Sequence, residues 1–251
     1  MKKIIASMLF MPLLAVANPI DDNCSQHVIH GAPVSSISEN TQYICHGNYA
    51  IHYRFDTKTA EYVVEHLDNS DITGPAKRKN NFGPDPLVDD SKEAQLEDYK
   101  GHPYDRGHLS PAANNRTDQD QMNASFYLTN MIPQDPGNNR GIWRILEIAV
   151  RNVAADGRDI YVASGTVYDE GYKIIGNSVG VPTRIWKVVF DTKTNESIGF
   201  LFPNEKLSTK DLPEYATTVD EIETVTGINF FPNMGESGED VFNLENWLQT
   251  K

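Results

Sequence analysis

The most informative stretch of the sequence is the octapeptide Tyr104-Asp105-Arg106-Gly107-His108-Leu109-Ser110-Pro111. It places a carboxylate, a guanidinium, a glycine and an imidazole in four consecutive positions. Such polar side chains are seldom buried unless they are paired, and a glycine among them indicates unusual backbone geometry or close approach to another group. A turn at Gly107 would let the three polar side chains converge. A plain surface turn with an Asp–Arg ion pair is the alternative.

An amphipathic helix is predicted downstream, from Asn138 to Val153. At about 100° per residue, its apolar and charged positions fall on opposite faces. The polar face could instead be a solvated stripe with Arg–Glu pairs, and Asn139 could be an N-cap. The apolar face comprises Ile142, Ile145, Leu146, Ala149 and Val150, and the polar face comprises Arg140, Arg144, Glu147 and Arg151.

The remaining pattern predicts one α+β domain over residues 18–251, with a central antiparallel sheet flanked by helices. β-Forming runs alternate with turn residues, and a turn at 56–59 makes a hairpin of the first two runs. Residues 68–103 read as a loop with a helical turn or two within 91–99. Strands are expected at 49–55, 60–67, 126–130, 159–164, 184–191 and 196–202, and helical segments at 119–125 and after 219.

The first 17 residues have the pattern of a signal peptide. Lys2 and Lys3 precede a mostly apolar run, and Ala15-Val16-Ala17 is a small-residue cleavage site. Cleavage there predicts a secreted or periplasmic protein that begins at Asn18; a short buried helix is the alternative. No run reaches the roughly 18 apolar residues of a membrane span, so no membrane partner is expected.

Export gives the two cysteines a role. Cys24 and Cys45 are predicted to form a disulfide that pins an N-terminal arm over residues 18–45. Closing a loop of about twenty residues would stabilise the fold by roughly 3 kcal/mol in the chain-entropy picture. A zinc site with His27, His30 and His46 is the weaker interpretation, because two thiols alone are a poor zinc site.

The formal net charge is −13, and removing Lys2 and Lys3 takes it to −15. Affinity for nucleic acid normally comes from Lys and Arg, so this balance argues against a nucleic-acid partner. Net charge, however, bears on solubility and association more than on local chemistry. The distribution of the basic residues therefore decides the matter.

Four blocks of sequence together carry a specific resemblance. They resemble the DNA/RNA non-specific endonucleases, the family of the Serratia nuclease and mitochondrial endonuclease G, which has a ββα-metal active site. Order and spacing match throughout residues 104–147. The blocks are Tyr104-Asp105-Arg106-Gly107-His108-Leu109, Asn130-Met131-Ile132-Pro133-Gln134, Asn138-Asn139-Arg140-Gly141-Ile142-Trp143 and Leu146-Glu147.

The resemblance implies a role for each matched residue. His108 matches the general base, and an imidazole suits that task because its pKa lies near neutrality. Asn139 matches the direct protein ligand of a single Mg²⁺, with Mn²⁺ as the alternative. Glu147, also a catalytic position, and Asp105 would hold the waters of that ion. The products would carry 5′-phosphates.

Substrate contacts are expected from arginines and one asparagine. Arg106 would bind phosphate bidentately, and Arg78 is assigned to an upstream catalytic arginine of the family. That register is open, because Asn80 and Asn81 lie nearer to the matching Phe82 and Asp85-Pro86. Asn130, Arg140 and Arg144 are assigned to substrate binding.

DNA and RNA are therefore the expected substrates, bound with modest, salt-sensitive affinity and without sequence preference. A homodimer and a protein inhibitor are left open as partners. The alternatives are a secreted metal-dependent phosphoesterase acting on small phosphate esters and a non-enzymatic binding protein. A zinc protein is disfavoured because the histidines show no ligand spacing; they are His27, His30, His46, His52, His66, His102 and His108.

Overall fold

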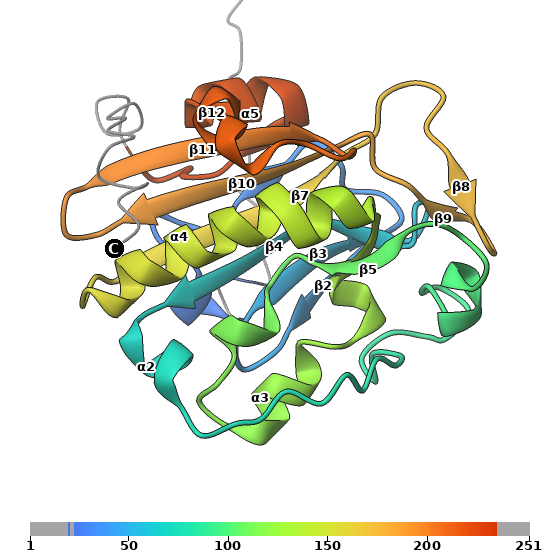
Figure 1. Ribbon diagram of the computed structural model, residues 1–251, viewed down its shortest axis with the longest axis horizontal. Helices are drawn as coiled ribbons and strands as arrows, with labels where there is room; N and C mark the ends of the chain where they lie inside the picture. Colours follow the sequence, from blue (N-terminus) through green and yellow to red (C-terminus); the bar gives the residue numbers. More distant parts are fainter. Residues whose placement is uncertain (1–19, 21–22, 235–251) are drawn as a thin grey trace, which may run out of the picture.

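The computed structural model describes residue 20 and residues 23–234; the predicted signal peptide lies outside them. Its main feature is a seven-stranded antiparallel sheet of order β12-β11-β10-β7-β4-β3-β2 (Figure 1). The predicted α+β fold with a central antiparallel sheet is confirmed. The strands are β2 (Thr41–Cys45), β3 (Ala50–Arg54), β4 (Thr59–Leu67), β7 (Ile160–Val167), β10 (Arg184–Asp191), β11 (Glu196–Pro203) and β12 (Ala216–Thr217).

Smaller elements surround this sheet. Two-stranded ribbons pair β1 (Val34–Ser35) with β13 (Ile228–Asn229), β5 (Asp105–His108) with β6 (Met131–Gln134), and β8 (Ile174–Ile175) with β9 (Val179–Gly180). The α-helices are α2 (Asn69–Thr73), α3 (Gln119–Ala124), α4 (Arg144–Ala155) and α5 (Val219–Thr226). Short 3₁₀ turns are η1 (Ser25–His27), η2 (Leu96–Tyr99), η3 (Ala112–Asn114), η4 (Leu128–Asn130) and η6 (Thr209–Tyr215), and η5 (Asn138–Trp143) is a π-helix.

Each face of the sheet carries a hydrophobic core, because successive strand residues point to opposite sides. In β10, Ile185 and Val189 belong to the core beneath α4, while Val188 and Phe190 belong to the other core, which α5 covers. Figure 1 shows α4 lying across the sheet. Lys187 shares the α4 side: it is 1% exposed, and its ammonium lies 4.7 Å from the centre of an indole ring of η5.

The predicted helix 138–153 is two elements rather than one. Its apolar face is confirmed for α4, where Leu146, Ala149 and Val150 are buried. The preceding turn is π-helical, and Gly141 (φ −103°, ψ −111°) breaks the regular geometry. Residues before that break therefore do not continue the helical wheel of α4.

The polar octapeptide contains a strand, so the predicted turn at 105–108 is wrong. β5 runs antiparallel to β6, with Asp105 opposite Gln134 and His108 opposite Met131. A Cβ on Gly107 would lie 1.9 Å from Oε1 of Gln134. The glycine is thus required for close approach between the strands.

The predicted strand at 126–130 is also wrong. Phe126 and Leu128 are fully buried, but the chain there forms a turn and then η4, and the strand begins only at Met131. Within the predicted loop 68–103, α2 was not anticipated. Asp68 and Asp71 form a capping box that begins this helix.

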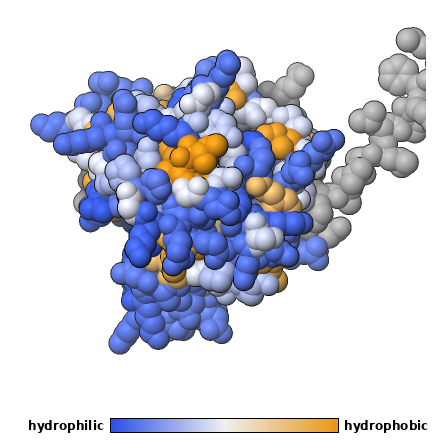
Figure 2. All heavy atoms as spheres, turned by 90° about the vertical axis from the view of Figure 1, so that its right-hand side faces the viewer, coloured by the Kyte–Doolittle hydropathy of each residue, from blue (hydrophilic) through white to orange (hydrophobic). Residues whose placement is uncertain are grey.

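The predicted disulfide is present, with the Cα atoms of Cys24 and Cys45 5.9 Å apart. It links the N-terminal arm to the end of β2. Among the described residues, no helix is both long and apolar enough to cross a membrane. The face seen in Figure 2 is chiefly hydrophilic, with separate small hydrophobic patches.

Candidate active site

The β5–β6 ribbon and the start of α4 form the framework of the site. Strand alternation puts Arg106 and His108 on one side of β5, and Asp105 and Gly107 on the other. The indole Nε1 of Trp143 donates to the backbone oxygen of His108 over 3.3 Å. This bond ties the ribbon to the residue that immediately precedes α4.

A cleft of about 310 Å³ lies at this junction. It brings together seven of the predicted site residues, although they come from three separate stretches of the chain. Arg151 also lines it, and residues 111–113 form one wall. The seven are Arg78, Arg106, His108, Asn139, Arg140, Arg144 and Glu147.

Positive charge dominates the cleft. Five of its lining side chains are arginines and one is a glutamate, although the chain as a whole carries −13. A larger hollow of about 570 Å³ lies elsewhere; its lining includes Asp118 and Asp120 but no lysine or arginine. Of these two hollows, the smaller cleft therefore has the charge that a phosphodiester requires.

His108 is 9% exposed and packs against two phenylalanine rings, whose centres also lie 5.0 Å from each other. Its ring centre is 5.0 Å from that of Phe126, at 89°, and 5.7 Å from that of Phe82. Burial, followed by the charges of Arg78 and Arg106, lowers the pKa of His108 to about 3. This pKa lies well below the near-neutral value expected from the sequence. The imidazole is therefore neutral near pH 7, the form in which it can accept a proton.

The same two phenylalanines make cation–π contacts with the nearby arginines. The guanidinium of Arg106 lies 4.3 Å from the centre of the Phe82 ring, and that of Arg78 lies 5.1 Å from the centre of the Phe126 ring. Cation–π contacts of this kind restrain a guanidinium without using its hydrogen-bond donors. Nε of Arg78 donates to Oδ1 of Asn80 over 2.8 Å, but its Nη groups remain available to an anion, and Arg78 lies in the cleft.

Asp105 lies beside the cleft and orients Asn139. The Nδ2 group of Asn139 donates to the Asp105 carboxylate over 2.9 Å, which turns Oδ1 of that amide away from Asp105. Arg140 donates to the same carboxylate through Nε (2.8 Å) and Nη2 (2.5 Å). Partial burial raises the pKa of Asp105, but these hydrogen bonds outweigh it and hold the pKa below its ordinary value.

This arrangement gives Arg140 a different partner from the one expected. Its guanidinium is engaged by both oxygens of Asp105, so it neutralises that carboxylate. Arg140 also lines the cleft, and its predicted contact with substrate stays a prediction. Arg144 is exposed and lines the cleft as well.

Glu147 and Arg151 lie one helical turn apart on α4. Burial raises the pKa of Glu147, and the charges of Arg151, Lys187 and Arg78 oppose that rise. Arg151 was predicted only as part of a polar helix face, not as a site residue. Its i,i+4 spacing from Glu147 was the available signal.

Asn130 does not line the cleft and is fully buried. Its Oδ1 accepts from the backbone N–H of Ser110 over 2.9 Å, and its Nδ2 donates to the backbone oxygens of Ser110 and Ser125. The predicted substrate contact is therefore wrong for this geometry. Asn130 instead fixes the backbone two residues after His108.

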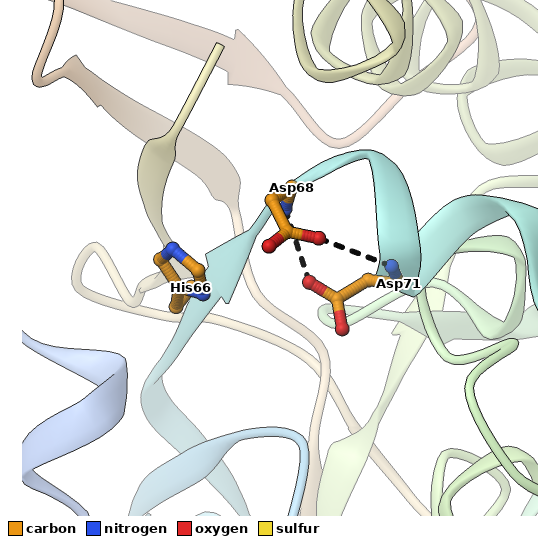
Figure 3. A group of neighbouring side chains, drawn as sticks. All are labelled: His66, Asp68 and Asp71. Atoms are coloured by element: carbon orange, nitrogen blue, oxygen red, sulfur yellow. Dashed lines mark hydrogen bonds between the residues drawn. The ribbon is translucent and has the colours of Figure 1, made fainter. Parts of the chain in front are cut away.

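Outside the cleft, His66, Asp68 and Asp71 form a cluster of potential metal ligands (Figure 3). Among the residues that the structure describes, it is the one group of three or more histidine, cysteine or carboxylate side chains close enough to share an ion. Its carboxylates form the capping box of α2, and Nε2 of His66 bonds to Asp159. Since these groups already have protein partners, the cluster has a structural explanation, and it contains only one histidine.

Sequence comparison identifies relatives with nuclease names. A model of the family "DNA/RNA non-specific endonuclease" matches residues 28–237. The mitochondrial nuclease EXOG of Homo sapiens is 32% identical over 218 residues, which is 79% of this chain and 59% of that protein. A nuclease of a Nostoc species is 32% identical over 81% of this chain and 78% of its own length.

Structural comparison agrees on the fold. A crystal structure of the EndoG/EndoGI complex matches with a TM-score of 0.77 and 24% identity, covering 86% of this chain and 94% of the matched chain. This chain spans 59–61% of the length of the human and Xenopus laevis EXOG proteins. Because the family match extends over most of the sequence, the chain belongs to the DNA/RNA non-specific endonuclease family.

Proposed function

We propose that this protein hydrolyses phosphodiester bonds within DNA and RNA. One observation carries the proposal: a neutral, buried His108 shares a cleft with several arginines and with the pair Asn139 and Glu147. A base, anion-binding groups and hard oxygen ligands are what this hydrolysis requires. The family membership supports the same reaction.

The residues present fit a hydrated Mg²⁺, with Mn²⁺ as the alternative ion. Asp105 orients the Asn139 amide so that its oxygen is the free ligand atom, and Glu147 lines the same cleft. Amide and carboxylate oxygens suit a hard cation that keeps most of its waters. Such an ion would neutralise phosphate charge and stabilise the leaving oxygen.

Within this site, His108 would take the proton of the attacking water. Nε2 of His108 is buried without a partner among the described residues, so Nδ1 is the ring nitrogen left for that water. Arg106 and Arg78 would bind the phosphate oxygens. The new bond joins the water oxygen to phosphorus, the bond from phosphorus to the 3′ oxygen breaks, and the product carries a 5′-phosphate.

We expect little sequence preference. Contacts through arginine to phosphate position a nucleic acid but do not read its bases. They also make affinity salt-dependent, and the acidic remainder of the chain adds nothing to it. Cleavage rates should therefore fall as salt rises.

Export and partners complete the proposal. The leader pattern at 1–17 and the Cys24–Cys45 disulfide support a secreted or periplasmic protein. The structure of similar fold concerns inhibition of EndoG by EndoGI, and we propose a protein inhibitor here by analogy. Size-exclusion chromatography of the mature chain, alone and after incubation with candidate inhibitors, would test both that and a homodimer.

Digestion of supercoiled plasmid and of RNA tests the central proposal. Wild-type protein should cut both with Mg²⁺ and neither with EDTA, and Asn139→Ala should need far more Mg²⁺. His66→Ala is the matched control, because His66 belongs to the cluster that has structural partners. Cleavage insensitive to EDTA would refute the metal site. Activity on small phosphate esters alone would favour the phosphoesterase alternative.

A further inference from the structure

Glu65 is a buried carboxylate that the chemistry above does not use. It lies on β4 and is 2% exposed. Its neighbours on the same side of the strand, Val63 and Leu67, are apolar core residues. An ionisable group at such a position is costly unless it is hydrogen-bonded, so the partners of Glu65 indicate why it is there.

Both partners belong to the loop that follows His108. The hydroxyl of Ser110 donates to Oε2 of Glu65 over 2.7 Å, and Nδ2 of Asn114 donates to Oε1 over 2.9 Å. The residues between these two anchors, 111–113, form a wall of the cleft. One carboxylate therefore fixes both ends of that wall.

The connection continues to the opposite side of the cleft. Nη1 of Arg151 donates to Oδ1 of Asn114 over 3.2 Å. Asn114 thus bonds Glu65 with its amide nitrogen and Arg151 with its amide oxygen. The charge of Arg151 opposes the rise in the pKa of Glu147, so it acts directly on a carboxylate of the cleft.

Lys187 supplies compensating charge beneath the site. Its ammonium donates to the hydroxyl of Ser164 and lies against the Trp143 ring. Burial raises the pKa of Glu65 to about 7 and also raises that of Glu147, and the charge of Lys187 opposes both rises. The cation therefore lies within electrostatic reach of both carboxylates and favours their ionised forms.

We propose that Glu65 is a positioning residue of this active site, an inference that rests on the nuclease function proposed above. Its carboxylate holds the wall at 111–113 in place. Through Asn114 it also sets the position of Arg151 beside Glu147. Glu65 itself touches neither substrate nor metal.

The test is a double-mutant cycle. Glu65→Gln and Asn114→Ala should each lower kcat on plasmid DNA by about tenfold with KM nearly unchanged, since they displace groups that act in the transition state. In an Arg151→Ala background, Asn114→Ala should cause a clearly smaller further loss, because the hydrogen bond between Arg151 and Asn114 is already absent. Glu61→Gln is the control: Glu61 is a buried carboxylate of the same strand, bonded to His52 and Ser35, outside the cleft.

Three outcomes would overturn the proposal. The first is wild-type kcat in folded Glu65→Gln and Asn114→Ala. The second is a loss from Asn114→Ala that is equal with and without Arg151. The third is a crystal structure of Asn114→Ala with Arg151 unmoved. If Glu65→Gln does not fold, Asn114→Ala carries the test alone. A wild-type protein that cuts no nucleic acid would refute the nuclease function, whereas the crystal structure would still test the placement of Arg151.

Discussion

Two buried histidines of this protein have contrasting surroundings. His52 and His108 each have a buried Nε2 without a hydrogen-bond partner in the described part of the chain. Nδ1 of His52 bonds to Oε2 of Glu61 over 2.6 Å, and its ring stacks on Tyr43 at 4.3 Å. Among the described residues, His108 has no carboxylate partner. It lines an open cleft, and the nearby charges that shift its pKa are two arginines.

The comparison shows that surroundings, rather than residue type, assign a histidine its role. A carboxylate on Nδ1 occupies the nitrogen and makes the ring a structural partner. The arginines and phenylalanines around His108 keep its imidazole neutral, with one ring nitrogen free to accept a proton. Substitutions at the two positions should therefore have opposite consequences.

The largest expected effect is on catalysis by His108→Ala. Loss of a general base should reduce plasmid cleavage by about a thousandfold. The melting temperature should fall as well, because the buried ring packs against Phe82 and Phe126, so the rate is expressed per folded molecule. Initial rates and thermal melts of the purified variant measure both. A variant that retains most of the wild-type rate would show that another group accepts the proton.

His52→Ala should show the reverse behaviour. It leaves the buried Glu61 carboxylate without its imidazole partner and with only the Ser35 hydroxyl, which should cost about 3 kcal/mol of unfolding free energy. The rate per folded molecule should stay at the wild-type value, since His52 is remote from the cleft residues. Urea unfolding, with activity corrected for the folded fraction, separates the two. A large loss of rate in fully folded His52→Ala would show that His52, like His108, contributes to catalysis.

A pH experiment sharpens the comparison at His108. Its pKa is about 3 in the folded protein and near 6.5 in an unfolded chain. As pH falls below 6.5, the unfolded chain therefore binds the proton first, and folded stability is lost. At pH 4.5 the wild type should have lost about 2 to 3 kcal/mol more than His108→Gln, relative to pH 7. Urea unfolding at both pH values measures this; equal losses would contradict the buried, neutral imidazole.

The smallest effect concerns the arginine that lies on Phe82. Arg106→Lys keeps the charge but loses the planar, bidentate geometry, so kcat/KM should fall by roughly tenfold. Arg184→Lys is a matched control, because Arg184 bonds Asp169 bidentately outside the cleft. Plasmid cleavage under steady-state conditions measures both. Equal effects would mean that the planar guanidinium of Arg106 contributes nothing specific to cleavage.

Much of the site could be read from the sequence because motif residues are contiguous. The octapeptide and the start of the helix supplied six of the seven predicted side chains that the cleft brings together. Asn130 was misassigned because a motif position does not reveal whether an amide faces a cleft or a backbone. The ion pair of Arg140 was not anticipated, because its partner Asp105 is 35 residues away in sequence.

The main strands were predicted well because both faces of the sheet are buried, which produces long β-branched and aromatic runs. The β5 strand was missed because a four-residue strand rich in charge has no such run. Phe126 was placed in a strand on composition, although its ring serves as a packing surface for His108 and Arg78. Tertiary contacts of this kind leave no periodic signal.

The β5–β6 ribbon has a consequence for attempts to transplant this chemistry. Its two strands, β5 and β6, pair with each other outside the seven-stranded sheet. The four residues of β5 are therefore not held in position by the motif alone. A graft onto another scaffold would also need the clamp from Asn130 to the backbone of Ser110 and the two aromatic rings around His108. The smallest portable unit is therefore a set of contacts from distant segments rather than a peptide.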